Sequence, residues 1–164
     1  MRNFLSQIEI SLQANLYYVS LFASLAVPDI CGAINSESGK ASGRKYVKWF
    51  DKHVGQKYPF FTGKDCYRFR CSLLHQGSSQ RSDARYSRIL FIEPSATTNI
   101  SHNNILNDAL NIDVRIFCLD IVEGAREWLG EVEQTQRYER NYSKFMRRYP
   151  NGLPPYIVGV PIIS

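Results

Sequence analysis

Arg70 and His75 are the residues of this sequence whose types could do chemistry, by binding an anion and by carrying a proton. Four residues, Cys-Ser-Leu-Leu, separate them. A guanidinium is always charged and can hold two phosphate oxygens in a fork. An imidazole that titrates near about pH 6.5 can act as general base or general acid. Together the two side chains supply a cation and a proton carrier.

The segment that carries this pair is predicted to be a helix. Thr62-Gly-Lys-Asp65 has the form of a capping box with Asp in place of Glu, and Gly77 suits the left-handed position that ends many helices. We therefore expect a helix that starts at the capping box and ends at Gly77.

Arg70 lies on the apolar face of this helix. At about 100° per residue, Arg70 is about 140° from His75, whereas Arg68 is about 20° from it. A buried arginine needs a carboxylate, carbonyl groups or a ligand anion, because its charge is too costly to bury alone. Arg70 is therefore either part of an internal ion pair, for example with Asp51 or Glu9, or a ligand-binding residue. It meets His75 only if the last turn loosens, if the arginine reaches around the helix, or if two copies of the chain meet.

Three further helices are expected. Apolar residues recur at steps of three or four from residue 4 to 25, which predicts one long buried helix that stops near Pro28. Ser42 is expected to open a second helix that Gly55 closes. The last helix is predicted over residues 113–147, with acidic residues in its first half and basic residues in its second.

The stretch between the third and fourth helices has a different pattern. The apolar run at 89–92 predicts a strand, with 105–112 as its hairpin partner. The proline-rich tail, 150–164, cannot be helical and should lie extended along the body. The predicted fold is mainly α: a four-helix bundle with a small β-hairpin insertion between helices 3 and 4, in a single domain over 1–164.

Composition and charge agree with a globular domain that binds an anion. The 164 residues are 44% hydrophobic and 21% charged, which is close to the globular norm. The net charge is +5, but residues 40–81 hold ten Lys and Arg against two Asp and Glu, or +8. This basic stretch is either a solvated face or the site of a polyanionic partner, of which nucleic acid is the commonest.

The four cysteines form no CxxC pair, which predicts reduced thiols in the core of a cytosolic protein. The spacing of Cys66, Cys71 and His75 lacks the short knuckle of a zinc site, so no metal or cofactor is expected. No apolar run reaches the ~18 residues of a membrane span. Polar residues such as Glu9 and Gln13 stand where a signal peptide would be apolar. We expect a cytoplasmic protein with no membrane partner.

The segment Arg70-Cys-Ser-Leu-Leu-His75 resembles the R-x4-6-H signature of the HEPN superfamily. Members are small helical bundles, many of which are metal-independent endoribonucleases of toxin–antitoxin, CRISPR and phage-defence systems. The surrounding block, residues 65–77, is also similar to a run found in uncharacterised bacterial proteins. Arg68 fits the signature as R-x6-H. The resemblance implies a four-helix HEPN-like bundle and a homodimer in which two such helices face one cleft.

The resemblance also implies an activity. Arg70 and His75 would be catalytic and would cleave single-stranded or tRNA-like RNA through attack of the 2′-hydroxyl, leaving a 2′,3′-cyclic phosphate and a 5′-hydroxyl. An antitoxin or defence partner protein would fit such a role. The residues expected to support the catalytic pair are Arg68, Cys71 and Asp65, and those expected to bind the RNA backbone are Lys45, Lys48, Lys52 and Lys64.

Cys71 departs from the family pattern, because active members typically have Asn, Asp, His or Ser after the arginine. A thiol is a poor hydrogen-bond donor. The alternative is therefore a catalytically inactive HEPN-like module that binds RNA, a nucleotide or a protein. A third hypothesis is a helical scaffold protein in which Arg70 is only ion-paired.

Overall fold

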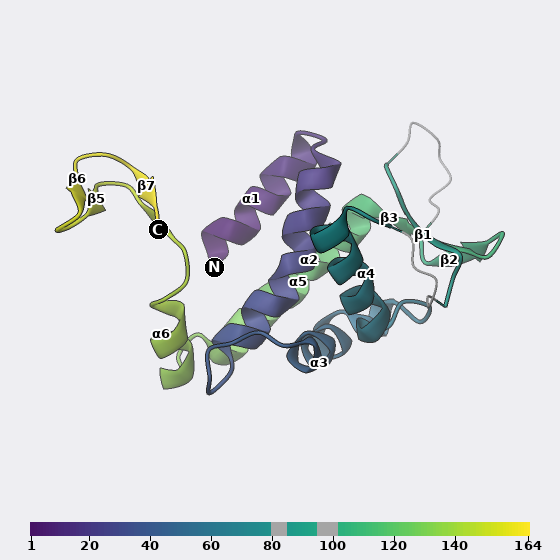
Figure 1. Cartoon of the computed structure of the whole chain (residues 1–164), viewed down its shortest axis with the longest axis horizontal. Helices are drawn as coiled ribbons and strands as arrows, with labels where there is room; N and C mark the ends of the chain where they lie inside the picture. Colours follow the sequence, from purple (N-terminus) through teal and green to yellow (C-terminus); the bar gives the residue numbers. More distant parts are fainter. Residues whose placement is uncertain (80–84, 95–101) are drawn as a thin grey trace.

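The computed structural model describes residues 1–79, 85–94 and 102–164. The chain is mainly α, with helices gathered around α2 (Figure 1). Against α2 pack α1, α3 and α5, with further contacts from α4 and α6. The helices are α1 (Arg2–Gln13), α2 (Tyr17–Ile34), α3 (Gly43–His53), α4 (Gly63–Gln76), α5 (Val114–Val132) and α6 (Gln136–Tyr142), with a short 3-10 turn at Gly55–Lys57.

Two of the predicted helices are present with the predicted ends. Ser42 caps α3 by accepting a hydrogen bond from the backbone N–H of Lys45, and the helix gives way to the 3-10 turn that begins at Gly55. α4 begins after Thr62 and ends at Gly77. Local chemistry explains these ends. The hydroxyls of Ser42 and Thr62 cap the starts of α3 and α4, and Gly77 ends α4 in the left-handed conformation. Each of these groups satisfies backbone groups that have no partner inside the helix, without help from the rest of the fold.

The predicted first helix is wrong: it is two helices joined by a tight reversal. Asn15 adopts a left-handed conformation with φ of 57°, which turns the chain back on itself. The hydroxyls of Ser11 and Ser20 lie 2.7 Å apart and tie α1 to α2 across the turn. The second helix then continues through Pro28 to Ile34, because Pro28 is packed in the core and its ring is accommodated there.

α2 is also apolar enough to cross a membrane, by length and composition alone. Of the helices in the described ranges it is the one that meets this test, and 44% of the stretch is buried against the rest of the protein.

The predicted last helix is also two helices. α5 ends at Val132, and Thr135 caps α6 by accepting a hydrogen bond from the N–H of Tyr138. Beyond α6 the tail forms two small antiparallel ladders and projects away from the helices, rather than lying along them as expected (Figure 1). Its strands are β4 (Arg148–Tyr149), β5 (Gly152–Leu153), β6 (Ile157–Val158) and β7 (Ile162–Ile163).

A three-stranded sheet follows α4 in the sequence and precedes α5. It consists of β1 (Arg88–Ile92), β2 (Asn104–Leu106) and β3 (Ala109–Asp113), in the order β1-β3-β2. The predicted hairpin pairing is wrong, because β3 runs parallel to β1 and antiparallel to β2. Asn107 and Asp108 both have positive φ, which makes the tight turn within 105–112 itself.

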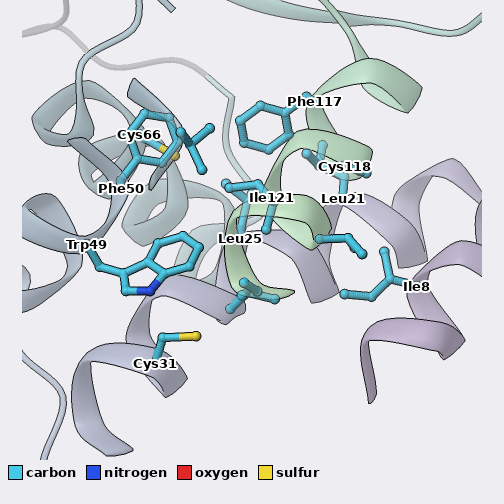
Figure 2. Packing of buried hydrophobic residues seen from close by; sticks show 14 of the residues in the cluster. Ile8, Leu21, Leu25, Cys31, Trp49, Phe50, Cys66, Phe117, Cys118 and Ile121 are labelled. Atoms are coloured by element: carbon cyan, nitrogen blue, oxygen red, sulfur yellow. The ribbon is translucent and has the colours of Figure 1, made fainter. Parts of the chain in front are cut away.

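Aromatic rings join the sheet to the helices. Phe117 of α5 lies edge-on to Tyr58, Phe61 and Phe91, with ring centroids 5.2–6.2 Å apart. Figure 2 shows Phe117 beside Ile121 and Cys118 of the same helix, facing Leu25 and Leu21 of α2. Three of the four cysteines are buried in the core, as expected, and burial raises the pKa of the Cys118 thiol to about 12.

Phe117→Ala should lower the free energy of unfolding by about 3–5 kcal/mol, because it removes a buried ring and leaves a cavity. Leu119→Ala on the same helix is the matched control. Leu119 is 42% exposed, so its truncation should change stability by less than about 1 kcal/mol. Urea denaturation of both variants measures the difference, and equal losses would contradict the core described above.

Candidate functional site

α4 holds the predicted catalytic pair and is fixed at both ends. The Thr62 hydroxyl accepts from the N–H of Asp65 at 3.2 Å, and the Asp65 carboxylate accepts from the N–H of Thr62 at 3.2 Å. Gly77 ends the helix with φ of 65°. Asp65, which was expected to support catalysis, therefore serves as half of the capping box.

Arg70 reaches along α4 to His75. Arg70 Nη1 lies 3.0 Å from His75 Nε2, although the two positions are far apart around an ideal helix. Of the three routes by which they could meet, the long arginine side chain takes the second and reaches around the helix. Because a guanidinium only donates, Nε2 of His75 accepts this hydrogen bond. His75 is exposed at the end of the helix, so the pair is open to solvent.

Asp29 of α2 holds the other end of the guanidinium. Arg70 Nη2 lies 2.7 Å from Asp29 Oδ2, with side chains only 20% and 14% exposed. The predicted internal ion pair is therefore present, but the proposed partners are wrong. Glu9 instead binds Arg126 at 2.6 Å, and Asp51 accepts a hydrogen bond from the N–H of Gly63 at 2.7 Å.

Burial and the ion pair act on Asp29 in opposite directions. Burial raises the pKa of the Asp29 carboxyl above its ordinary value, and the Arg70 cation opposes this rise only in part. A carboxylate taken out of water is stabilised mainly by its cation. Asp29 and Arg70 therefore depend on each other, and their contact fixes α4 against α2.

Cys71 belongs to the same cluster. Its sulfur lies 4.0 Å from Arg70 Nη1, and its hydrogen bond with the hydroxyl of Tyr67 raises the pKa of that tyrosine. Cys71 is half-buried, unlike the three core cysteines. The thiol thus contacts the guanidinium that contacts His75.

Arg68, the other arginine that fits the signature, lies closer to the start of α4 than the last turn that carries His75. Arg68 lines a small cavity of about 30 Å³ with Phe69, Ser72 and Tyr86, between α4 and the segment that leads into β1. The contact with His75 that the structure shows is made by Arg70.

The basic residues predicted to surround the pair lie elsewhere. Lys45, Lys48 and Lys52 of α3 line a groove formed with α2 and α5, to which no described residue of α4 contributes. Lys64 is exposed at the start of α4, eleven residues before His75, or about 16 Å along the axis. Three of the four lysines predicted to bind the RNA backbone therefore line a groove to which the helix of the Arg70–His75 pair does not contribute.

Asp29 is the site residue that the sequence analysis missed. It is the one charged residue between Glu9 and Glu37, in an otherwise apolar stretch. A lone carboxylate in a buried helix needs a cation, and Arg70 on an apolar face needs a carboxylate. The signal was present in both helices, but only their packing pairs them.

The arrangement offers a cation and an imidazole at a solvent-exposed helix end. Within the part of the chain that the structure describes, no three His, Cys, Asp or Glu residues are placed to hold a metal ion. Arg70 can bind an anion and His75 can transfer a proton.

Comparison with protein-family models, with curated proteins and with solved structures finds no match for this chain.

Asp29→Asn should lower the free energy of unfolding by about 2 kcal/mol, below the ~3–5 kcal/mol of a fully buried pair, because it leaves Arg70 without its anion. Arg70→Met should also destabilise. The loss of unfolding free energy in the double variant should be smaller than the sum of the two single losses by at least about 1 kcal/mol, as expected for residues in contact. Urea denaturation of the four proteins measures this coupling. If the losses of unfolding free energy were additive, the contact would contribute nothing to stability.

The Arg70→Met defect should shrink as the pH falls from about 7 to about 5. Without the cation, the folded-state pKa of Asp29 rises further above its unfolded value, so the folded state binds the proton more tightly and gains stability as the pH falls. Unfolding curves of wild type and variant at both pH values measure the effect. A defect that grows on acidification would contradict the buried, unpaired carboxylate.

Proposed function

We propose that this protein is a HEPN-like endoribonuclease that cleaves RNA without a metal. The observation that carries the proposal is the 3.0 Å contact between Arg70 Nη1 and His75 Nε2 at the solvent-exposed end of α4. It brings the arginine and histidine of an R-x4-6-H segment together despite their unfavourable angular spacing. A cytoplasmic toxin or phage-defence component is the role that this resemblance favours.

The chemistry follows from the two side chains. Phosphate oxygens of the substrate bind Nη1 of Arg70 and displace Nε2 of His75 from it. The freed nitrogen then accepts the proton of the 2′-hydroxyl, whose oxygen attacks the adjacent phosphorus and expels the 5′-oxygen. The guanidinium stabilises the charge that builds up on the phosphate oxygens. The leaving 5′-oxygen takes a proton from a second imidazole, so that a 2′,3′-cyclic phosphate and a 5′-hydroxyl result.

The helix arrangement is compatible with a HEPN-like bundle. α2 contacts α3, α4 and α5, and α3 contacts α4 and α5, and we propose that these four helices correspond to the bundle. α1, α6, the sheet and the tail then stand as additions to it. The candidate catalytic helix is the third of these four, as the resemblance implies.

A homodimer would supply a second histidine. One imidazole cannot easily both deprotonate the 2′-hydroxyl and protonate the leaving oxygen. Tyr18, Val19 and Phe22 of α2, which precede Asp29 by seven to eleven residues, are 77%, 57% and 38% exposed. At helical spacing, Tyr18 and Phe22 share a face with Asp29, so the apolar surface leads to the ion pair. We propose that a second copy of the chain covers this surface and brings its own His75 into the site.

The second candidate is a HEPN-like module that binds RNA or a protein without cleaving it. The specific observation in its favour is that Arg70 is already engaged by Asp29 and lies against the thiol of Cys71. This candidate is favoured if the purified protein binds RNA with an affinity that falls steeply with salt concentration but does not cleave the RNA.

His75→Ala should reduce RNA cleavage in EDTA by at least about 100-fold, because it removes the proton carrier. Arg70→Lys should have a comparable effect, since it keeps the charge but loses the fork. Gln76→Ala is the matched control, because Gln76 is exposed on the same helical turn. Initial rates on a single-stranded RNA and a tRNA measure all four proteins. Cleavage retained in both site variants would remove the assignment.

Tyr18→Glu should convert a dimer to a monomer and abolish cleavage, because it places a charge in the apolar contact next to the site. Tyr156→Glu is the control: Tyr156 is 84% exposed, but it lies in the tail. Sedimentation measures the mass of each protein and the same cleavage assay measures its activity. A wild-type monomer that cleaves RNA at full rate excludes the second histidine.

A further inference from the structure

A groove separate from the Arg70–His75 pair lies between α2, α3 and α5. Its volume is about 500 Å³, which is within the range of small-ligand sites. Four cations of α3 line it against a single carboxylate, that of Glu131. These cations are Arg44, Lys45, Lys48 and Lys52.

Two of the four cations are available to a ligand. Arg44 and Lys48 are exposed and have no acidic partner among the described residues. Lys52 is neutralised by an ion pair with Glu131. Lys45 donates to the carbonyl oxygen of Lys40 and to the Ser38 hydroxyl, but its charge is not cancelled by an acid there. The groove therefore keeps an excess of about three positive charges.

Both tryptophans of the chain line this groove. Trp49 is 5% exposed and Trp128 is 1% exposed, and neither indole N–H has a hydrogen-bond partner. Figure 2 shows the indole nitrogen of Trp49 on the ring edge that faces Cys31 of α2, which also lines the groove. Unpaired buried donors are rare in folded proteins, and an acceptor atom of a ligand would satisfy them.

The contacts of Lys52 and Lys45 bound the groove at its two ends. Near the end of α3, Lys52 forms an ion pair with Glu131 of α5. Near the beginning of α3, Lys45 donates hydrogen bonds to Ser38 and Lys40 of the preceding loop. Arg44 and Lys52 are eight residues apart, or about 12 Å along the helix. A compact anion fits between these limits better than a continuous strand.

We propose that this groove binds a small ligand that carries two or more phosphate groups. Arg44 and Lys48 contact the phosphates, Lys45 adds its charge, and the indole N–H groups donate to the acceptor atoms that enter deepest. The proposal does not rest on the ribonuclease assignment, because no described residue of α4 lines the groove. RNA offers the same phosphate chemistry, so it is a separate arm of the test.

Intrinsic fluorescence tests the proposal, because both of the protein's tryptophans are in the groove wall. Inorganic triphosphate, ATP and a single-stranded RNA are each titrated into the full chain while tryptophan emission is followed. We expect saturable changes with triphosphate or ATP. No change with either of them at millimolar concentration, or a change with RNA alone, overturns the small-ligand proposal.

Variants then locate the binding. Arg44→Ala with Lys48→Ala should raise the Kd by at least about tenfold, which corresponds to the loss of one charge-assisted contact. Trp49→Phe keeps the ring and removes one N–H, and should also raise the Kd, read from Trp128 emission or by calorimetry. Lys64→Ala and His75→Ala are the controls and should leave the Kd unchanged. A Kd that depends on the controls, or one that the double variant leaves unchanged, places the phosphates elsewhere.

Discussion

Burial of α2 is the constraint on which the rest of the structure depends. This helix has eighteen residues and one charge, that of Asp29, so most of its circumference must be kept from water. α1, α3 and α5 supply that cover, and the aromatic rings around Phe117 extend it to the sheet. The face that stays exposed, at Tyr18 and Phe22, is where we propose that a second copy of the chain binds.

The same constraint places the candidate catalytic pair. Asp29 needs a cation because its helix is buried, and α4 supplies Arg70. The guanidinium that satisfies Asp29 on one side is brought to His75 on the other. A structural ion pair and a candidate reaction centre thus share one side chain, which is why the two readings of Arg70 in the sequence are not exclusive. The cations of α3 line a different groove, together with the two tryptophans.

Capping signals in the sequence predicted the ends of α3 and α4, whereas long-range pairing was predicted poorly. The capping box at Thr62 and the glycine at Gly77 act within one turn, so α4 was predicted with its correct ends. The reversal at Asn15 was missed, because the apolar repeat continues through it and only tertiary packing bends the chain there. The parallel pairing of β1 with β3 was missed for a related reason: a strand's sequence pattern does not encode its neighbour.

By itself the sequence determined that the chain is mainly α and that its middle is basic. It also placed an arginine on the apolar face of a capped helix, where the charge of that arginine must have a partner. The tertiary structure alone decided that this partner is Asp29, that Arg70 meets His75, and that the lysines of α3 line another groove. The physical reason is range. Caps, periodicity and net charge follow from neighbours along the chain, whereas ion pairs between helices follow from which apolar faces must be buried together.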